Sequence, residues 1–121
     1  MVETKLGEVE SRFADIIWDN EPLHSRELVR LCEEILGWNR STTYTVLRKL
    51  SDRGIFKNEG GMVSSRISRK DFAALQSEQF VDKTFDGSLP AFIAAFTRRK
   101  SLSAKEAEAI RRMIDQAAGE D

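Results

Sequence analysis

Apolar residues repeat with the 3.6-residue period of a helix in three segments of the first half of the chain. Pro22 follows the first segment, Gly37 ends the second and Gly54 ends the third, as expected of residues that stop helices. Between the first two helices, Leu23-His24 is predicted as a short strand. The predicted helices cover residues 7–19, residues 26–36 behind a cap at Ser25, and the segment from a cap at Asn39 or Ser41 to Gly54.

Two short strands are predicted after the third helix. Ile55–Asn58 and Met62–Ile67 are joined by Glu59-Gly60-Gly61, and such a glycine turn suits a tight hairpin. The order helix, strand, helix, turn, helix, hairpin is that of a winged helix, whose three helices bury one shared core. We therefore predict a mainly α, α+β winged helix-turn-helix, with a DNA-binding domain over residues 1–69.

The second half of the chain is predicted to be helical. Ser68 with Asp71, and later Ser103 with Glu106, match the spacing of capping boxes that begin helices. A short helix opened by Pro90 lies between them. These three helices carry more large apolar residues than they can bury among themselves, so residues 70–121 are predicted to form a helical dimerisation domain. The predicted dimer interface comprises Phe72, Leu75, Phe80, Phe85, Leu89, Phe92, Ile93, Phe96, Ile110, Met113 and Ile114.

The formal net charge of -1 conceals a strong separation of charge along the chain. Residues 38–70 contain 8 basic and 2 acidic residues, a net charge of +6, whereas residues 1–37 have a net charge of -5. Positive charge is thus concentrated on the third helix and the hairpin, where a phosphate-binding surface needs it.

The third predicted helix has an apolar face and a polar face. The apolar face contains Tyr44, Leu47 and Leu50. The polar face contains Thr42, Thr45 and Lys49. Hydroxyl and amino groups hydrogen-bond to base edges and phosphates, and a threonine methyl can contact thymine, so this face is predicted to read DNA. The side chains expected to contact phosphates beside it are Arg40, Arg48, Arg53 and Lys57.

Catalysis, metal binding and a cofactor are not predicted. His24 is the only histidine and Cys32 the only cysteine, so one subunit lacks a Ser/His/Asp or Cys/His set, and no glycine-rich phosphate loop is present. His24 is expected to cap a helix or lie at the surface, and Cys32 to be a buried thiol. Trp38 either fills the core or rests against a DNA backbone. No apolar run approaches 18 residues, so we expect a soluble, cytoplasmic protein without membrane insertion.

A winged helix can also serve as a protein–protein interaction module without sequence-specific DNA binding. This alternative leaves the charge of +6 on residues 38–70 unexplained. The sequence therefore favours binding to double-stranded DNA.

Three stretches resemble the penicillinase repressor family of winged-helix regulators: Leu6–Glu10 leading to Ile17-Trp18, Trp38–Gly54, and Phe80–Leu89 leading to Ala95-Phe96. The third is the most specific, because a helix-turn-helix alone is common. The resemblance implies a homodimeric transcriptional repressor that binds a palindromic operator with its amino-terminal domain and dimerises through its carboxy-terminal helices. It assigns base readout to Ser41, Thr42, Thr45 and Lys49.

The resemblance also implies a route of induction. In family members under β-lactam control, a membrane sensor-protease pathway leads to a cut within the dimerisation helices, and the corresponding bond here is Ala95-Phe96. Phe96 is retained, whereas Ala95 stands where asparagine is often found. Copper-responsive members carry paired cysteines, and with Cys32 alone this chain is not expected to sense copper.

Overall fold

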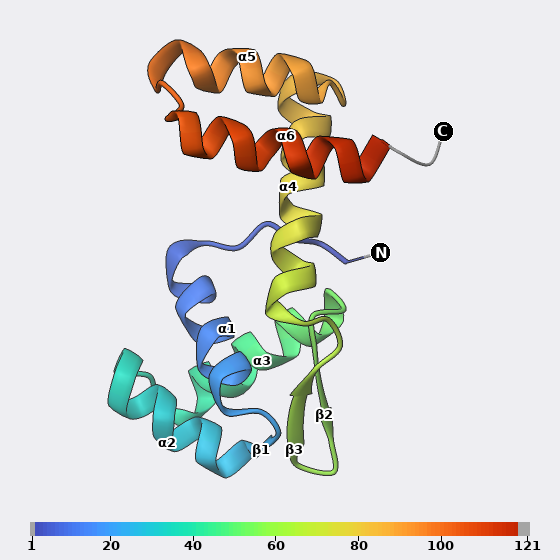
Figure 1. Ribbon diagram of the computed structural model, residues 1–121. Coiled ribbons are helices and arrows are strands. Elements are labelled where there is room, and N and C mark those ends of the chain that lie inside the picture. Colours follow the sequence, from blue (N-terminus) through green and yellow to red (C-terminus); the bar gives the residue numbers. More distant parts are fainter. Residues whose placement is uncertain (1, 119–121) are drawn as a thin grey trace. The chain divides into compact units, whose positions relative to one another are not determined.

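A computed structural model describes residues 2–118 and has the predicted α+β winged-helix architecture (Figure 1). Its elements are α1 (Glu8–Asn20), β1 (Leu23–His24), α2 (Ser25–Leu36), α3 (Arg40–Asp52), β2 (Phe56–Glu59), β3 (Met62–Ser65), α4 (Arg69–Phe85), α5 (Leu89–Arg99) and α6 (Ala104–Ala118). The chain divides into two compact units, Met1–Gln79 and Phe80–Asp121, and α4 continues from one into the other. Within the described residues, no helix is long and apolar enough to cross a membrane.

The core of the first unit is formed by α1, α2, α3 and the sheet. Each helix contributes the residues of its apolar stripe, and β2 and β3 each contribute inward-facing side chains. Trp18, at the end of α1, packs against this core and connects it to the start of α4. The largest fully buried side chains are those of Phe13, Ile17, Leu28, Leu50, Ile55, Phe56 and Val63.

The position of Phe72 corrects the predicted dimer interface. Its side chain is only 3% exposed, and its ring lies 5.4 Å from that of Trp18, centroid to centroid. The first turns of α4 therefore complete the core of the first unit. Helical spacing identified the apolar face of this helix, but spacing alone does not say which surface covers that face.

Side-chain caps fix the beginnings of α2 and α3. Of the two candidates for the α3 cap, Asn39 is the cap, and its side-chain oxygen accepts the N–H of Thr42 at 2.8 Å. The predicted cap of α2 is wrong: His24 Nδ1 accepts the N–H of Arg26 at 3.1 Å, and Ser25 is the first helical residue. The Ser25 hydroxyl is buried and instead accepts a hydrogen bond from the Tyr44 hydroxyl, which ties α2 to α3.

The three strands form an antiparallel sheet in the order β1-β3-β2. The strands are displaced from the predicted ones for two reasons. Ile55 still donates its N–H to Leu50 at the end of α3, so β2 begins one residue later and extends through Glu59. Ile67 lies outside the sheet, and its carbonyl accepts the indole N–H of Trp18 at 3.1 Å. β3 consequently ends at Ser65.

A two-residue turn, Gly60-Gly61, connects β2 to β3. Both residues have positive φ, 59° and 91°, which suits glycine and matches the twist of a hairpin. A Cβ on Gly61 would also lie 2.8 Å from Nε2 of His24, the ring that caps α2. A Cβ on Gly60 would meet nothing within 4 Å.

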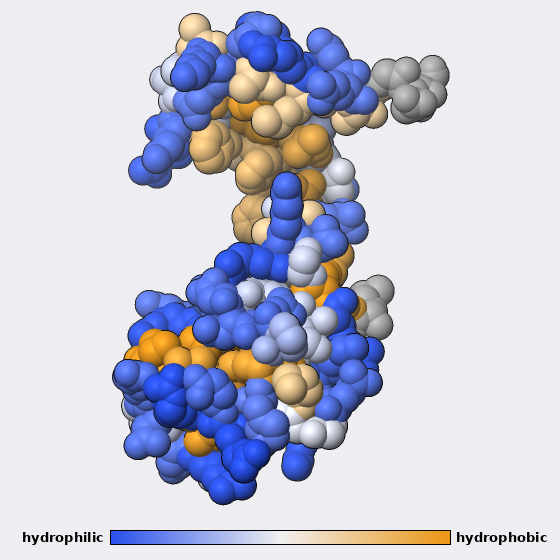
Figure 2. All heavy atoms as spheres, turned by 60° about the horizontal axis from the view of Figure 1, so that its bottom comes forward, coloured by the Kyte–Doolittle hydropathy of each residue, from blue (hydrophilic) through white to orange (hydrophobic). Residues whose placement is uncertain are grey.

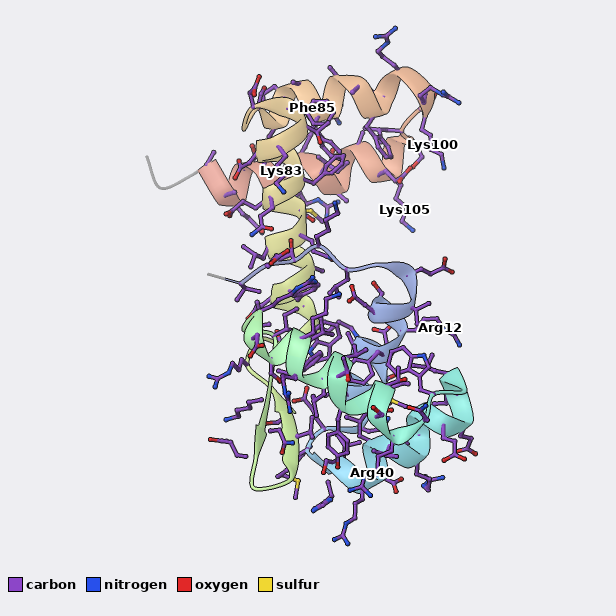
Figure 3. The ribbon with its side chains drawn as sticks, turned by 180° about the vertical axis from the view of Figure 1, so that it is seen from behind. Arg12, Arg40, Lys83, Phe85, Lys100 and Lys105 are labelled. Atoms are coloured by element: carbon purple, nitrogen blue, oxygen red, sulfur yellow. The ribbon has the colours of Figure 1, made fainter. Side chains whose placement is uncertain are left out.

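The second unit contains the end of α4 together with α5 and α6. The rings of Phe80, Phe85 and Phe92 contact one another edge to face, with centroids 5.6 to 6.1 Å apart, and Phe85 lies where α4 ends (Figure 3). No side chain of α5 or α6 is fully buried. Apolar side chains are visible over the surface of this unit (Figure 2). Those most exposed are Phe80, Leu89, Ile93, Phe96, Met113 and Ile114.

We predict that Gly61→Ala destabilises the protein more than Gly60→Ala. Positive φ should cost each variant about 1 kcal/mol, and displacing the His24 cap should cost Gly61→Ala about 1 kcal/mol more. Urea unfolding followed by circular dichroism measures both differences. Equal losses would show that the His24 ring does not constrain the turn.

Candidate nucleic-acid interface

The polar face of α3 presents hydroxyl groups to solvent. Ser41 and Thr45 are exposed and Thr42 is half-buried, while Thr43 on the opposite side is fully buried. The Thr45 hydroxyl donates to the carbonyl of Ser41 at 2.9 Å, so its oxygen remains free to accept and its methyl group remains accessible. Thr42 and Thr45 of the predicted polar face, together with Ser41, thus form a hydroxyl stripe at the surface of the first unit.

Two arginines of α3 flank these hydroxyls. Arg40 projects from the start of the helix (Figure 3), with its guanidinium 5.7 Å from the centroid of the Tyr44 ring. Arg48 is exposed and forms no ion pair with any residue in the range 2–118. Both cations are therefore available to a phosphate in solution.

A shallow hollow of about 280 Å³ lies between α3 and β2. Arg48 and Asn58 line it, and the Ser51 hydroxyl oxygen is buried with no hydrogen-bond partner among residues 2–118. Tyr44 and Leu47 complete the lining. The hollow brings polar groups of the helix and of the hairpin together on one side of the hydroxyl stripe.

Lys49 and Arg53, the other two cations predicted to contact DNA from this region, have partners inside the protein. Lys49 Nζ lies 2.8 Å from Oε2 of Glu10, which is in the first turn of α1. Arg53 donates to the carbonyl of Lys5 at 2.8 Å and lies 3.9 Å from Oε1 of Glu10. The hydrogen bond from Lys49, together with that from the Gly7 N–H, lowers the pKa of Glu10 from its ordinary value of 4.5. Glu10 thus stays ionised at neutral pH.

Lys57 lies on β2 and not on α3. Its ammonium lies 3.1 Å from a carboxylate oxygen of Glu59, two residues along the same strand. Both side chains are exposed enough for solvent to screen this pair, so the pair leaves Lys57 free to move. The structure places Lys57 on the hairpin rather than in the hydroxyl stripe.

Trp38 and Cys32, which the sequence also singled out, have structural roles. Trp38 stacks on Phe13 with ring centroids 5.5 Å apart, which favours its core role over a role at the DNA backbone. Burial raises the pKa of the Cys32 thiol to about 11, so Cys32 is the predicted buried thiol. Among residues 2–118, no group of three potential ligands could hold a metal ion.

Sequence reasoning missed the extended segment before α1. Thr4 is buried in this segment, and its hydroxyl bonds to Gln79 of α4, while Gln76 donates to its carbonyl at 3.2 Å. On the other side, Arg53 at the end of α3 bonds to Lys5. This segment has no hydrophobic periodicity, so nothing in its pattern predicts that it joins the end of α3 to the middle of α4 within the first unit.

Comparison with known proteins identifies the family. The sequence profile described as penicillinase repressor matches residues 6–116. The penicillinase repressor of Bacillus licheniformis is 19% identical over 116 residues, covering 93% of this chain and 91% of the relative. The methicillin resistance regulatory protein MecI of Staphylococcus aureus is 20% identical over 116 residues, covering 93% and 94%.

Because the profile spans nearly the whole chain, this protein belongs to the penicillinase repressor family. The resemblance found in the sequence is thereby confirmed, and the relatives are regulatory proteins rather than enzymes by their names.

Proposed function

We propose that this protein is a transcriptional repressor that binds double-stranded operator DNA through its first unit. The observation that carries the proposal is the surface of α3, where exposed hydroxyls lie between arginines that have no carboxylate partner in the described part of the chain. Hydroxyl groups discriminate base edges, and arginines neutralise phosphates. Membership of the penicillinase repressor family supports the same role.

Each side chain has its own part in the proposed complex. Ser41, Thr42 and Thr45 face the bases of the major groove, and Arg40 and Arg48 bind the phosphates on either side. Lys57 of the hairpin adds a further phosphate contact. Lys49 lies on the same helix and Arg53 directly follows it, but both are already bonded within the protein.

Replacing Thr45 by alanine is expected to weaken binding to a site selected from a random DNA pool by about 1–3 kcal/mol, with little effect on random duplexes. Replacing Arg48 by alanine should weaken both alike and reduce the slope of log affinity against log salt by roughly one. Fluorescence anisotropy at several salt concentrations measures both effects. Equal losses for Thr45→Ala on selected and random DNA would show that α3 reads DNA through another face.

The second unit supports a homodimer. Six large apolar side chains of this unit are between 41% and 64% exposed, and contact with a second copy would remove them from water. A two-fold dimer would present two α3 helices to the two halves of a palindrome. The proposal therefore assigns DNA binding to the first unit and dimerisation to the second.

Phe96 and Thr97 provide a matched test of the dimer. Phe96 is 47% exposed, and its neighbour Thr97 is also at the surface of α5. Phe96→Asp should yield monomers in sedimentation velocity and lower operator affinity by about 100-fold or more, because two half-sites are no longer linked. Thr97→Asp should remain dimeric. A wild-type protein that is monomeric at micromolar concentration would contradict the proposal.

We further propose that a cut at Ala95-Phe96 relieves repression. The bond lies inside α5, and cleavage would separate the end of this helix and all of α6 from the rest of the chain. Proteases bind extended segments, so α5 must first open locally. The cut would remove exposed apolar residues from the dimer surface without altering α3.

Cleavage is tested in cells that express the protein together with its neighbouring genes. After a cell-wall antibiotic is added, mass spectrometry should detect a fragment that ends at Ala95 when the repressed genes are induced. An intact chain during induction would exclude this route and would leave DNA binding and dimerisation unaffected as proposals.

A further inference from the structure

The Glu10 carboxylate lies near one backbone N–H and two cations. Its carboxylate accepts the Gly7 N–H at 3.1 Å, which caps α1, and lies 2.8 Å from Lys49 Nζ. Arg53 is more distant, 3.9 Å from Oε1. The Glu10 side chain is only 20% exposed, so solvent screens its pair with Lys49 less than a fully exposed pair.

Lys49 is the cation that Glu10 affects most. It lies four residues after Thr45, so both side chains project from the same side of α3. Without a partner, a lysine at this position would extend the hydroxyl stripe with a mobile positive charge. Arg53, by contrast, is fixed by its bond to the Lys5 carbonyl and is only 21% exposed.

The cations of α3 therefore differ in whether the rest of the protein gives them a carboxylate partner. Arg40 and Arg48 have no carboxylate partner within residues 2–118, whereas Lys49 is neutralised by a residue of α1. Phosphate neutralisation supplies most of the affinity for random DNA, and it carries no sequence information. A neutralised lysine beside the hydroxyls lowers that affinity and leaves the hydroxyl contacts intact.

We propose that Glu10 is a specificity-determining residue, which withholds Lys49 from DNA phosphates and thereby suppresses binding to random DNA. This inference rests on the proposed DNA-binding function of α3. Specificity is the ratio of affinities for the operator and for competing sequences, so weakening the competing interaction increases it.

The test is Glu10→Gln. Glutamine can still accept the Gly7 N–H, so the α1 cap is retained while the charge is lost. Freeing one lysine should raise the affinity for a random 30-base-pair duplex about fivefold near 0.15 M salt and steepen the salt slope by about one. Affinity for a site selected by the wild-type protein should rise less, so the specificity ratio should fall.

Two further variants isolate the role of Lys49. Glu8→Gln removes the same charge from the same turn of α1, but Glu8 has no ion pair among the described residues, so it should change random-DNA affinity less than twofold. In a Lys49→Gln background, Glu10→Gln should have no larger effect than Glu8→Gln. Circular dichroism establishes that each variant is folded.

A measurement on the wild-type chain is independent of any variant. The ¹⁵N-ammonium signal of Lys49 should keep its chemical shift when random duplex is added, since Glu10 still holds the group. The inference is overturned if this signal moves to a DNA-contact shift, or if Glu10→Gln and Glu8→Gln bind random DNA equally. Absence of any salt-dependent DNA binding by the wild-type protein would instead overturn the proposed function and this inference with it.

Discussion

The packing of Trp18 is the interaction on which the arrangement of the first unit depends. Its ring contacts Phe56 of β2 and Phe72 of α4, each with centroids 5.4 Å apart. Its indole N–H is satisfied by the carbonyl of Ile67, in the connection between hairpin and helix. One side chain of α1 thus fixes the hairpin and the start of α4 together. Because aromatic contacts have preferred geometry, they restrict how the hairpin and the start of α4 pack on α1.

The polar side chains of α3 and of the residue after it fall into two sets, those exposed to solvent and those bonded within the protein. Hydroxyls are exposed over the first two turns of α3, and the cations Lys49 and Arg53 near its end are bonded to α1 and to the segment before α1. In the proposed complex, the hydroxyls would supply the sequence-dependent contacts, and Arg40 and Arg48 would supply the sequence-independent attraction. The match to the family profile over residues 6–116 shows the family, and the local contacts show which cations near the end of α3 are already bonded within this chain.

The sequence predicted the elements well, since hydrophobic periodicity, helix-stopping glycines and the Gly60-Gly61 turn are local signals. It failed where a residue's role depends on a distant partner. Phe72 has the spacing of an apolar helix face, yet only the fold shows that Trp18 covers it. Glu10 resembles an ordinary first-turn acid, and nothing in its neighbourhood reveals Lys49, 39 positions later in the chain, as its ion-pair partner.

The burial of Cys32 allows site-selective chemical labelling of this protein at an introduced cysteine. Thiol reagents attack the thiolate, and burial raises the pKa of the Cys32 thiol to about 11, so only a very small fraction of it is thiolate at pH 7.5. A cysteine introduced at an exposed position would be a thiolate in about one molecule in ten at this pH. A spin label or fluorophore on a cysteine introduced at exposed Glu33 of α2, away from the hydroxyls of α3, would therefore attach selectively without removal of the native cysteine. Two labelled subunits of the proposed dimer would then report the separation of their first units, with and without DNA.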